Sequence, residues 1–268
     1  MSPASLLVLL VFALLAASPA PGQTVDELLR SSTTKRNARD FPGALADCDR
    51  ALALAPNNSQ IYLLRGEARK AAGDFAGALE DYNKALELKP TQSLAYGARS
   101  SVKWSMGDRT GALADLNKAV ELDPAPSRNT YANRAFLKQN TGDFAGAIAD
   151  YSKEIELYPS DSLTHYRRSS ARLAAGDTAG ALADLTKAIE LKPDYAAAFT
   201  ARGNLKQQFD DIGGAIADYT KAIELDPADV QAHRNRGNVK KAKGDLLGAM
   251  DDLDMALQLD AKSTASRR

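Results

Sequence analysis

An aspartate recurs at a nearly constant interval along most of this chain. The spacing is 34 residues at every step except one of 35, through Asp40, Asp74, Asp108, Asp143, Asp177, Asp211 and Asp245. We call each of these the reference aspartate of its unit. A period of this length predicts a row of similar units, each packed on its neighbours, rather than one or two ordinary domains.

Other positions keep the same register. An alanine follows each reference aspartate by four residues, and in six units a proline follows it by sixteen. This register divides the chain into seven predicted units at 25–58, 59–92, 93–126, 128–161, 162–195, 196–229 and 230–260, followed by a polar tail at 261–268.

Each unit is predicted to form two helices. In the second unit, residues 61–72 contain good helix formers and end at Gly73, and residues 76–88 end before Pro90, which cannot continue a helix. Small residues such as Gly66 and Ala78 occupy positions where the two helices must approach closely.

The pattern of Gly-Asp, alanine and proline in a 34-residue unit resembles the tetratricopeptide repeat, over residues 25–260. The resemblance implies an all-α, right-handed superhelical solenoid of antiparallel helix hairpins. The first unit departs most, because Arg30 to Arg36 lacks the small residue and the apolar spacing. Its first helix is expected either to fray or to form a polar cap.

The first 22 residues differ from the rest. Leu6 to Ala17 is an unbroken apolar run that is too short to span a bilayer, and a small, proline-broken segment follows it. This pattern predicts a cleaved signal peptide at 1–22 and a secreted or periplasmic mature chain without a membrane span. A short membrane-associating segment is the alternative.

Composition restricts the classes of function that this chain is expected to have. The 34 basic and 34 acidic residues cancel, so the chain has no net charge that would attract nucleic acid. Cys48 is the only cysteine and is expected to be buried, while His165 and His233 occupy a slot that other units fill with Tyr or Phe. We find no nucleophile and base, no phosphate-binding loop, no metal ligands and no cofactor motif, which predicts that the chain is not an enzyme.

Charged residues repeat as well. Six units have an arginine nine residues before the reference aspartate, and all seven have an aspartate seven residues after it, such as Arg65 and Asp81. We expect an ion pair that joins the two helices of a unit. A second cation, such as Arg69, follows the arginine by four residues and is expected to be a solvated side chain covering a helix face. Asp251, Asp252, Asp254 and Gln258 are expected to give the last helix a polar outer surface.

The resemblance implies that partners bind in a concave groove lined by the first helix of each unit. The groove positions in the second and third units include Glu67, Lys70 and Ser101. The predicted binding residues are Leu63, Leu94, Trp104, Phe136, Tyr166, Leu173, Asn204, Arg234, Asn238 and Lys241. Within this set, Trp104, Phe136 and Tyr166 are predicted to form an aromatic strip, with ordinary packing on neighbouring helices as the alternative.

The sequence therefore predicts a non-enzymatic scaffold that binds a protein or peptide. Two other functions stay open, namely a self-associating structural array and an accessory subunit of an envelope enzyme or assembly complex.

Overall fold

The computed structural model of the chain describes residues 23–123 and 130–265. The predicted signal peptide at 1–22 and the predicted start of the fourth unit at 128 lie outside the described residues, which contain fourteen helices and no strand. In chain order the helices are α2 (Val25–Asn37), α3 (Phe41–Leu54), α4 (Ser59–Ala71), α5 (Phe75–Leu88), α6 (Ser93–Ser105), α7 (Arg109–Leu122), α8 (Thr130–Asn140), α9 (Phe144–Leu157), α10 (Ser162–Ala174), α11 (Thr178–Leu191), α12 (Ala196–Gln208), α13 (Ile212–Leu225), α14 (Val230–Ala242) and α15 (Leu246–Ala265).

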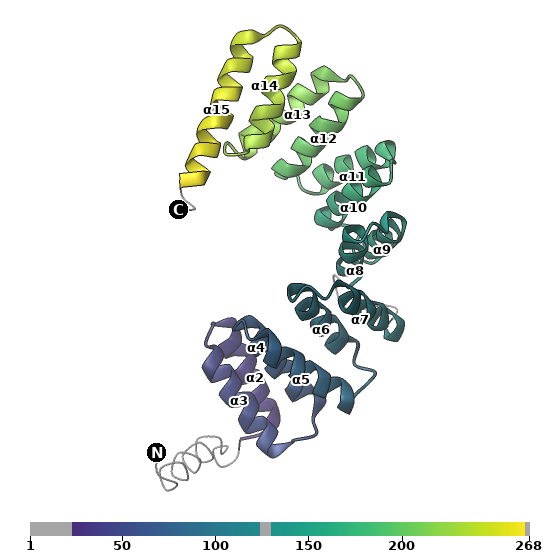
Figure 1. Ribbon diagram of the computed structural model, residues 1–268, viewed down its shortest axis with the longest axis vertical. Coiled ribbons are helices and arrows are strands. Elements are labelled where there is room, and N and C mark those ends of the chain that lie inside the picture. The colour runs from purple at the N-terminus through teal and green to yellow at the C-terminus, as the bar shows by residue number, and fades with distance from the viewer. Residues whose placement is uncertain (1–22, 124–129, 266–268) are drawn as a thin grey trace. The chain divides into compact units, whose positions relative to one another are not determined.

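The helices belong to two compact units that divide within α8, between Leu137 and Lys138. In each unit the closest packing joins the two helices of one hairpin, such as α4 with α5 or α14 with α15 (Figure 1). The second helix of a hairpin also packs on the first helix of the next, as α5 does on α6 and α13 on α14. This confirms the predicted all-α solenoid of helix hairpins.

The reference aspartate caps the second helix of its hairpin. In the second hairpin, the Asp74 side chain accepts a hydrogen bond from the Gly77 amide, and the preceding Gly73 has a φ of 85°. Gly77 must lack a side chain, because a Cβ there would lie 2.2 Å from Asp74 Oδ2. The Gly-Asp pair thus forms the turn between the two helices and starts the second one.

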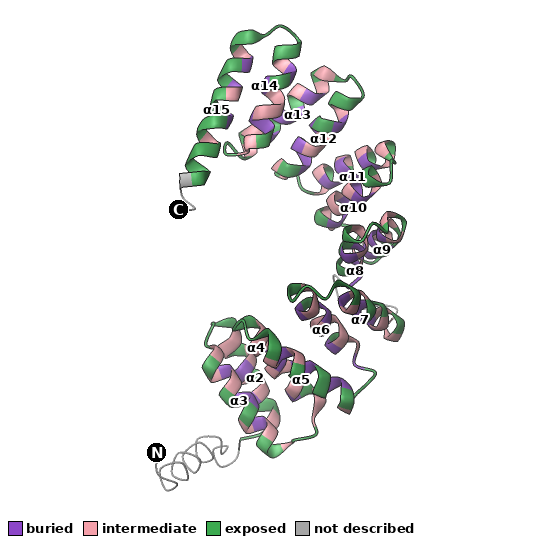
Figure 2. Ribbon diagram, viewed as in Figure 1, coloured by how far each residue is buried: buried purple, intermediate pink, exposed green. Residues whose placement is uncertain are grey.

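Small residues fill the contacts between helices. Ala78 and Ala85 of α5 are fully buried, and a Cβ on Gly66 would lie 2.7 Å from the Tyr82 ring. Figure 2 shows buried residues on the inner face of each hairpin, between exposed outer faces. The close approach expected from the sequence is confirmed.

The first hairpin is folded. Helix α2 is continuous and begins with a capping box in which the Thr24 hydroxyl accepts from the Glu27 amide while the Glu27 carboxylate accepts from the Thr24 amide. Leu28 is buried against Cys48, which is itself buried as predicted. Fraying of this helix is therefore wrong, and the polar-cap alternative holds, because Glu27, Arg30 and Thr34 are exposed.

The outer surface of the last helix is polar only in part. Asp251, Asp254 and Gln258 are exposed as predicted, but Asp252 is buried in an ion pair, and Leu246, Met250 and Leu257 of α15 are also exposed. With Ala261 where earlier units have proline, α15 continues to Ala265 and has 20 residues, whereas the other second helices have 14.

Among the described residues, no helix has both the length and the apolar character needed to cross a membrane.

Candidate partner-binding surface

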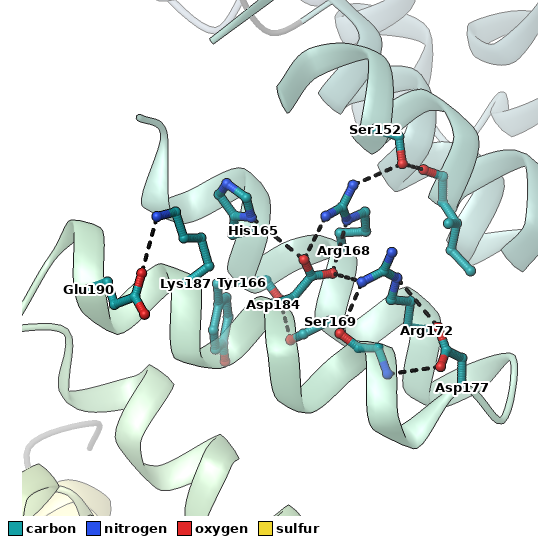
Figure 3. Close-up of polar contacts among 12 residues, drawn as sticks. Ser152, His165, Tyr166, Arg168, Ser169, Arg172, Asp177, Asp184, Lys187 and Glu190 are labelled. Carbon is teal, nitrogen blue, oxygen red and sulfur yellow. Dashed lines mark hydrogen bonds and ion pairs between the residues drawn. The ribbon is translucent and has the colours of Figure 1, made fainter. Parts of the chain in front are cut away.

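The repeated arginine and aspartate join the two helices of a hairpin, as predicted. In the fifth hairpin, Arg168 Nη2 lies 2.6 Å from Asp184 Oδ1 and Arg168 Nε lies 2.9 Å from Asp184 Oδ2 (Figure 3). The same two-point geometry recurs in the third, sixth and last hairpins, between Arg99 and Asp115, Arg202 and Asp218, and Arg236 and Asp252. These arginines are therefore structural and do not line a basic groove.

The second cation is not merely solvated, which corrects our prediction. Arg172 Nη1 lies 2.9 Å from Asp184 Oδ2, so the buried carboxylate has two cationic partners. In other hairpins the second cation binds its aspartate at 2.8 to 3.0 Å, through Arg69, Lys103, Lys138, Lys206 and Lys240. The spacing places each cation one helical turn beyond the arginine and on the same side of the helix, but it does not distinguish a solvated side chain from one that reaches the carboxylate. We call the arginine, second cation and aspartate of a hairpin its ion-pair triad.

Each triad arginine also contacts the preceding hairpin. Arg168 Nη1 lies 2.9 Å from Ser152 Oγ on α9, and Arg236 Nη1 lies 3.0 Å from Thr220 Oγ1 on α13. Burial acts to raise the pKa of Asp184, but the polar interactions with His165 and Arg168 outweigh it and hold that pKa below its usual value. The triad thus links helices within a hairpin and between hairpins.

The first hairpin lacks the triad arginine. Ser31 takes its position and donates to Asp47 at 2.6 Å, while Lys35 Nζ lies 2.7 Å from the same carboxylate oxygen. Arg50 approaches the other oxygen at 3.4 Å. This hairpin therefore keeps the second cation, because Lys35 lies five residues before Asp40 as Arg69 does before Asp74, and Ser31 and Arg50 take the place of the arginine.

The first compact unit contains a hollow of about 260 Å³ between α4, α6 and α8. The predicted groove residue Leu94 lines it and is 53% exposed. Other lining residues include Glu67, Lys70, Ser93, Gly97, Ser101, Thr130 and Asn133. The sequence pointed to Glu67, Lys70 and Ser101 here and missed the others.

Gly97 lines the hollow and has no side chain to fill it. It occupies the slot that holds Leu63 in the preceding hairpin and Tyr166 in the fifth, and a Cβ built on Gly97 would meet nothing within 4 Å. A glycine inside a helix costs about 1 kcal/mol relative to alanine, so its presence on an open face needs a reason. The glycine at this repeat position, where other hairpins have a large side chain, was the sequence signal that could have located the hollow.

The hollow carries one positive and one negative side chain at its edge. Glu67 forms an ion pair with Arg36, whereas the Lys70 ammonium lies 3.3 Å from the Ser101 hydroxyl. Burial and the nearby charge of Arg36 lower the pKa of Lys70. A carboxylate next to Lys70 would offset the charge of Arg36 and stabilise the ammonium, so this edge favours an anionic group.

Trp104 and Phe136 lie together, as the predicted aromatic strip requires. Their ring centroids are 5.6 Å apart in an edge-to-face arrangement, and the Arg109 guanidinium lies 5.6 Å from the Trp104 ring centroid. Trp104 packs partly against the core at Leu116, whereas Phe136 is 43% exposed. This pair combines core packing with an accessible ring.

The other predicted residues divide between surface and core. Leu63 is only 3% exposed and packs with Tyr82 and Val102, so it leaves no surface for a partner. Tyr166 belongs to the second compact unit, where its ring contacts Tyr195 at 5.1 Å between centroids.

The remaining predicted residues of the second unit lie on α10, α12 and α14. Leu173, Asn204, Asn238 and Lys241 are exposed. Asn204 Oδ1 accepts hydrogen bonds from the Tyr219 hydroxyl and from Asn235, and Arg234 pairs with Asp260 at 2.5 Å. These contacts leave Asn238 and Lys241 as the more accessible polar groups on α14.

The two histidines are packing residues next to the triads. His165 and His233 are buried, with Nδ1 at 3.5 Å from Asp184 Oδ1 and at 3.6 Å from Asp252 Oδ1, respectively. In other hairpins an aromatic ring fills this slot beneath the triad arginine, as Tyr62 does beneath Arg65. Within the described residues, no three His, Cys, Asp or Glu side chains gather in a way that could hold a metal ion.

Comparison with known proteins agrees with this architecture. Family models of the tetratricopeptide repeat match residues 29–93, 94–126, 132–196 and 211–244. No curated protein matches the sequence.

Several solved structures share the fold at low sequence identity. The C-terminal part of a TPR repeat-containing protein from Cytophaga hutchinsonii is 20% identical, with 87% of this chain and 95% of that chain covered and a TM-score of 0.72. A tetratricopeptide repeat protein from Parabacteroides merdae is 20% identical, with coverage of 89% and 94% and a TM-score of 0.64. YrrB, described as a TPR protein with an unusual peptide-binding site, is 19% identical, with coverage of 69% and 95% and a TM-score of 0.62. With four matched segments and the hairpin architecture in agreement, this chain belongs to the tetratricopeptide repeat family.

Proposed function

We propose that this chain is a non-catalytic scaffold that binds an extended segment of a partner protein in the groove of its first compact unit. The observation that carries the proposal is the hollow that Gly97 lines between α4, α6 and α8. Membership of the tetratricopeptide repeat family supports a role in protein interaction in general. The hollow adds a specific place for a side chain of the partner.

The lining residues indicate what that partner presents. Leu94 and the open position at Gly97 favour an apolar side chain, while the Lys70 ammonium favours a carboxylate next to it. Phe136 offers a further exposed ring in the same unit. A segment with an acidic residue close to an apolar one therefore fits this part of the groove best.

We also propose that the chain acts outside the cytoplasm, in the periplasm or after secretion. The apolar run from Leu6 to Ala17 and the small residues after it support this. Determining the first residue of the chain recovered from its native host would test it, since an uncleaved Met1 contradicts export by signal cleavage.

The groove proposal is tested by filling the hollow. We would select 12-residue peptides from a phage-displayed library on the full chain and measure their affinity for Gly97→Leu and Lys70→Glu variants. The selected peptides should pair an acidic with an apolar residue. Gly97→Leu should weaken their binding by at least about tenfold, since a side chain there would occupy the space of the ligand. Lys70→Glu should disfavour the acidic peptides most.

A matched control is available in α13. Gly213 is exposed, and a Cβ there would also meet nothing within 4 Å, so Gly213→Leu makes the same chemical change away from the hollow. Both glycine substitutions should leave the melting temperature unchanged or raise it, because leucine favours helix. Peptides that bind Gly97→Leu as tightly as the unmodified chain would contradict the proposal.

A further inference from the structure

The outer face of α15 carries an apolar stripe. Leu246, Met250, Leu253 and Leu257 are spaced by four, three and four residues, so they lie along one side of the helix. Leu246, Met250 and Leu257 are 61%, 59% and 67% exposed. Within the described residues, nothing covers Leu246, Met250 and Leu257, whereas Leu253 is half-buried. In α5 the residues at the positions of Leu253 and Leu257, which are Tyr82 and Leu86, are both buried.

The equivalent positions elsewhere form the contact between hairpins. Leu79, Tyr82 and Leu86 of α5 pack on Ala95, Ala98 and Val102 of the following helix α6. In the second compact unit, Leu182, Leu185 and Ile189 of α11 pack in the same way on Ala198, Ala201 and Leu205 of α12. The stripe on α15 is therefore one half of a contact between hairpins.

The other half of that contact has a recognisable pattern. The incoming helix presents apolar residues at positions i, i+3 and i+7 and the triad arginine at i+4, as Ala198, Ala201, Leu205 and Arg202 do on α12. The arginine reaches a polar side chain on the preceding helix, nine residues after its reference aspartate. Arg99 lies 2.8 Å from Asn83, and Arg65 lies 2.7 Å from Asp49.

Asp254 is the corresponding acceptor on α15. It is exposed, and in the described part of the chain no arginine reaches it. Asp251 is exposed one turn earlier. The face therefore combines an uncovered apolar stripe with an acidic edge.

We propose that this face of α15 binds an amphipathic helix of a partner protein, with apolar residues at i, i+3 and i+7 and an arginine at i+4 that pairs with Asp254. The bound helix takes the place that the first helix of a following hairpin has elsewhere in the array. This surface is separate from the hollow at Gly97, so the inference stands independently of the groove proposal.

A second copy of this chain fits the face poorly. Helix α2 has Glu27, Arg30 and Thr34 at the i, i+3 and i+7 positions and Ser31 at i+4, so it offers neither the apolar stripe nor the arginine. Two copies of α15 would bring carboxylates rather than an arginine to the edge that holds Asp254. The charge at Asp254 and the pattern of apolar residues therefore both favour a different protein as the partner of this face.

The experiment uses a helix whose packing is known from this structure. The probe is a hydrocarbon-stapled, fluorescent peptide with the sequence of residues 194–209, which contains α12, and its binding to the full chain is followed by fluorescence anisotropy. Leu257→Glu should abolish binding, and Asp254→Lys should weaken it by at least about tenfold. A probe with Arg202→Glu should bind the unmodified chain weakly and the Asp254→Lys variant better, because the charges are then exchanged.

Met255→Glu is the matched control. Met255 is exposed on α15 away from the stripe, so this variant should bind the probe like the unmodified chain. Circular dichroism of all variants should show unchanged helix content, because the substituted side chains are solvent-exposed.

Two outcomes would overturn the proposal. The first is a probe affinity that does not change with Leu257→Glu or with the charge exchange. The second is a dimer of the unmodified chain in light scattering that Leu257→Glu dissociates, which would make the face a contact between copies.

Discussion

The outward faces of the first and the last hairpins differ in polarity. The exposed residues of α2 include Glu27, Arg30 and Thr34, whereas those of α15 include Leu246, Met250 and Leu257. The same repeat unit thus presents a polar exposed face on α2 and an apolar exposed face on α15. The difference shows that the repeat pattern, which sets the contacts inside a hairpin, does not determine whether its outer face is polar or apolar.

The first and the last hairpins also differ in their ion-pair triads. The last hairpin has the complete set of Arg236, Lys240 and Asp252, but the first uses Ser31 and Lys35 around Asp47. A triad arginine spans two hairpins, and among the described residues no helix precedes α2 for it to reach. We infer that arginine is required where hairpins join, while the buried aspartate is required in every hairpin.

The largest expected effect comes from removing that aspartate. Asp252→Ala should lower the free energy of unfolding by about 3 to 5 kcal/mol, because it leaves two largely buried cations without their carboxylate. Asp47→Ala should cost less, about 1 to 2 kcal/mol, since the Lys35 side chain is 37% exposed and can return to water. Urea unfolding followed by circular dichroism measures both.

Asp251→Ala is the control for this pair, because Asp251 is exposed beside Asp252. Its unfolding curve should overlay that of the unmodified chain. Equal losses for Asp252→Ala and Asp47→Ala would show that the arginine contributes nothing beyond what Lys35 and Ser31 provide.

A second comparison concerns leucines in one slot of the repeat. Leu86 is 7% exposed in an interior hairpin, and Leu86→Ala should cost about 2 to 4 kcal/mol through lost burial and the cavity left behind. Leu257 occupies the same slot in the last hairpin, and Leu257→Ala should change stability by less than about 0.5 kcal/mol. A comparable loss for both, measured by urea unfolding, would mean that the α15 face is covered in solution.

The smallest expected effect is the response to acid. Burial acts to raise the pKa of Asp252, but hydrogen bonds from Arg236 and Lys240 outweigh it and lower that pKa; the pKa of Asp47 is lowered as well. A lowered pKa stabilises the fold above the unfolded value, about 3.9, and this contribution disappears as the pH falls through the folded value. The urea midpoint should therefore be flat from pH 7 to pH 5 and fall below about pH 4.

Asp252→Asn separates this effect from general acid denaturation. Its midpoint should be lower at neutral pH and fall less steeply in acid than that of the unmodified chain. An unchanged slope would show that Asp252 does not contribute to the acid response.

The repeat made most of the fold predictable. The spacing of the reference aspartate, the small residues and the prolines placed two helices in each unit, because caps, close contacts and helix ends depend on local residues. The pairing of Arg168 with Asp184 was also predictable, since the two recur together. The buried second partner was not, because a cation on a helix surface and one that reaches a neighbouring helix have the same local sequence.

The sequence by itself determined that this chain is a row of helical hairpins of one family. It also placed Trp104 and Phe136 on successive first helices. The tertiary structure alone decided what was accessible: it buried Leu63, left a hollow at Gly97 and exposed the apolar side of α15. The physical reason is that local sequence sets helix formation, whereas the exposure of a side chain depends on which neighbouring helix packs against it.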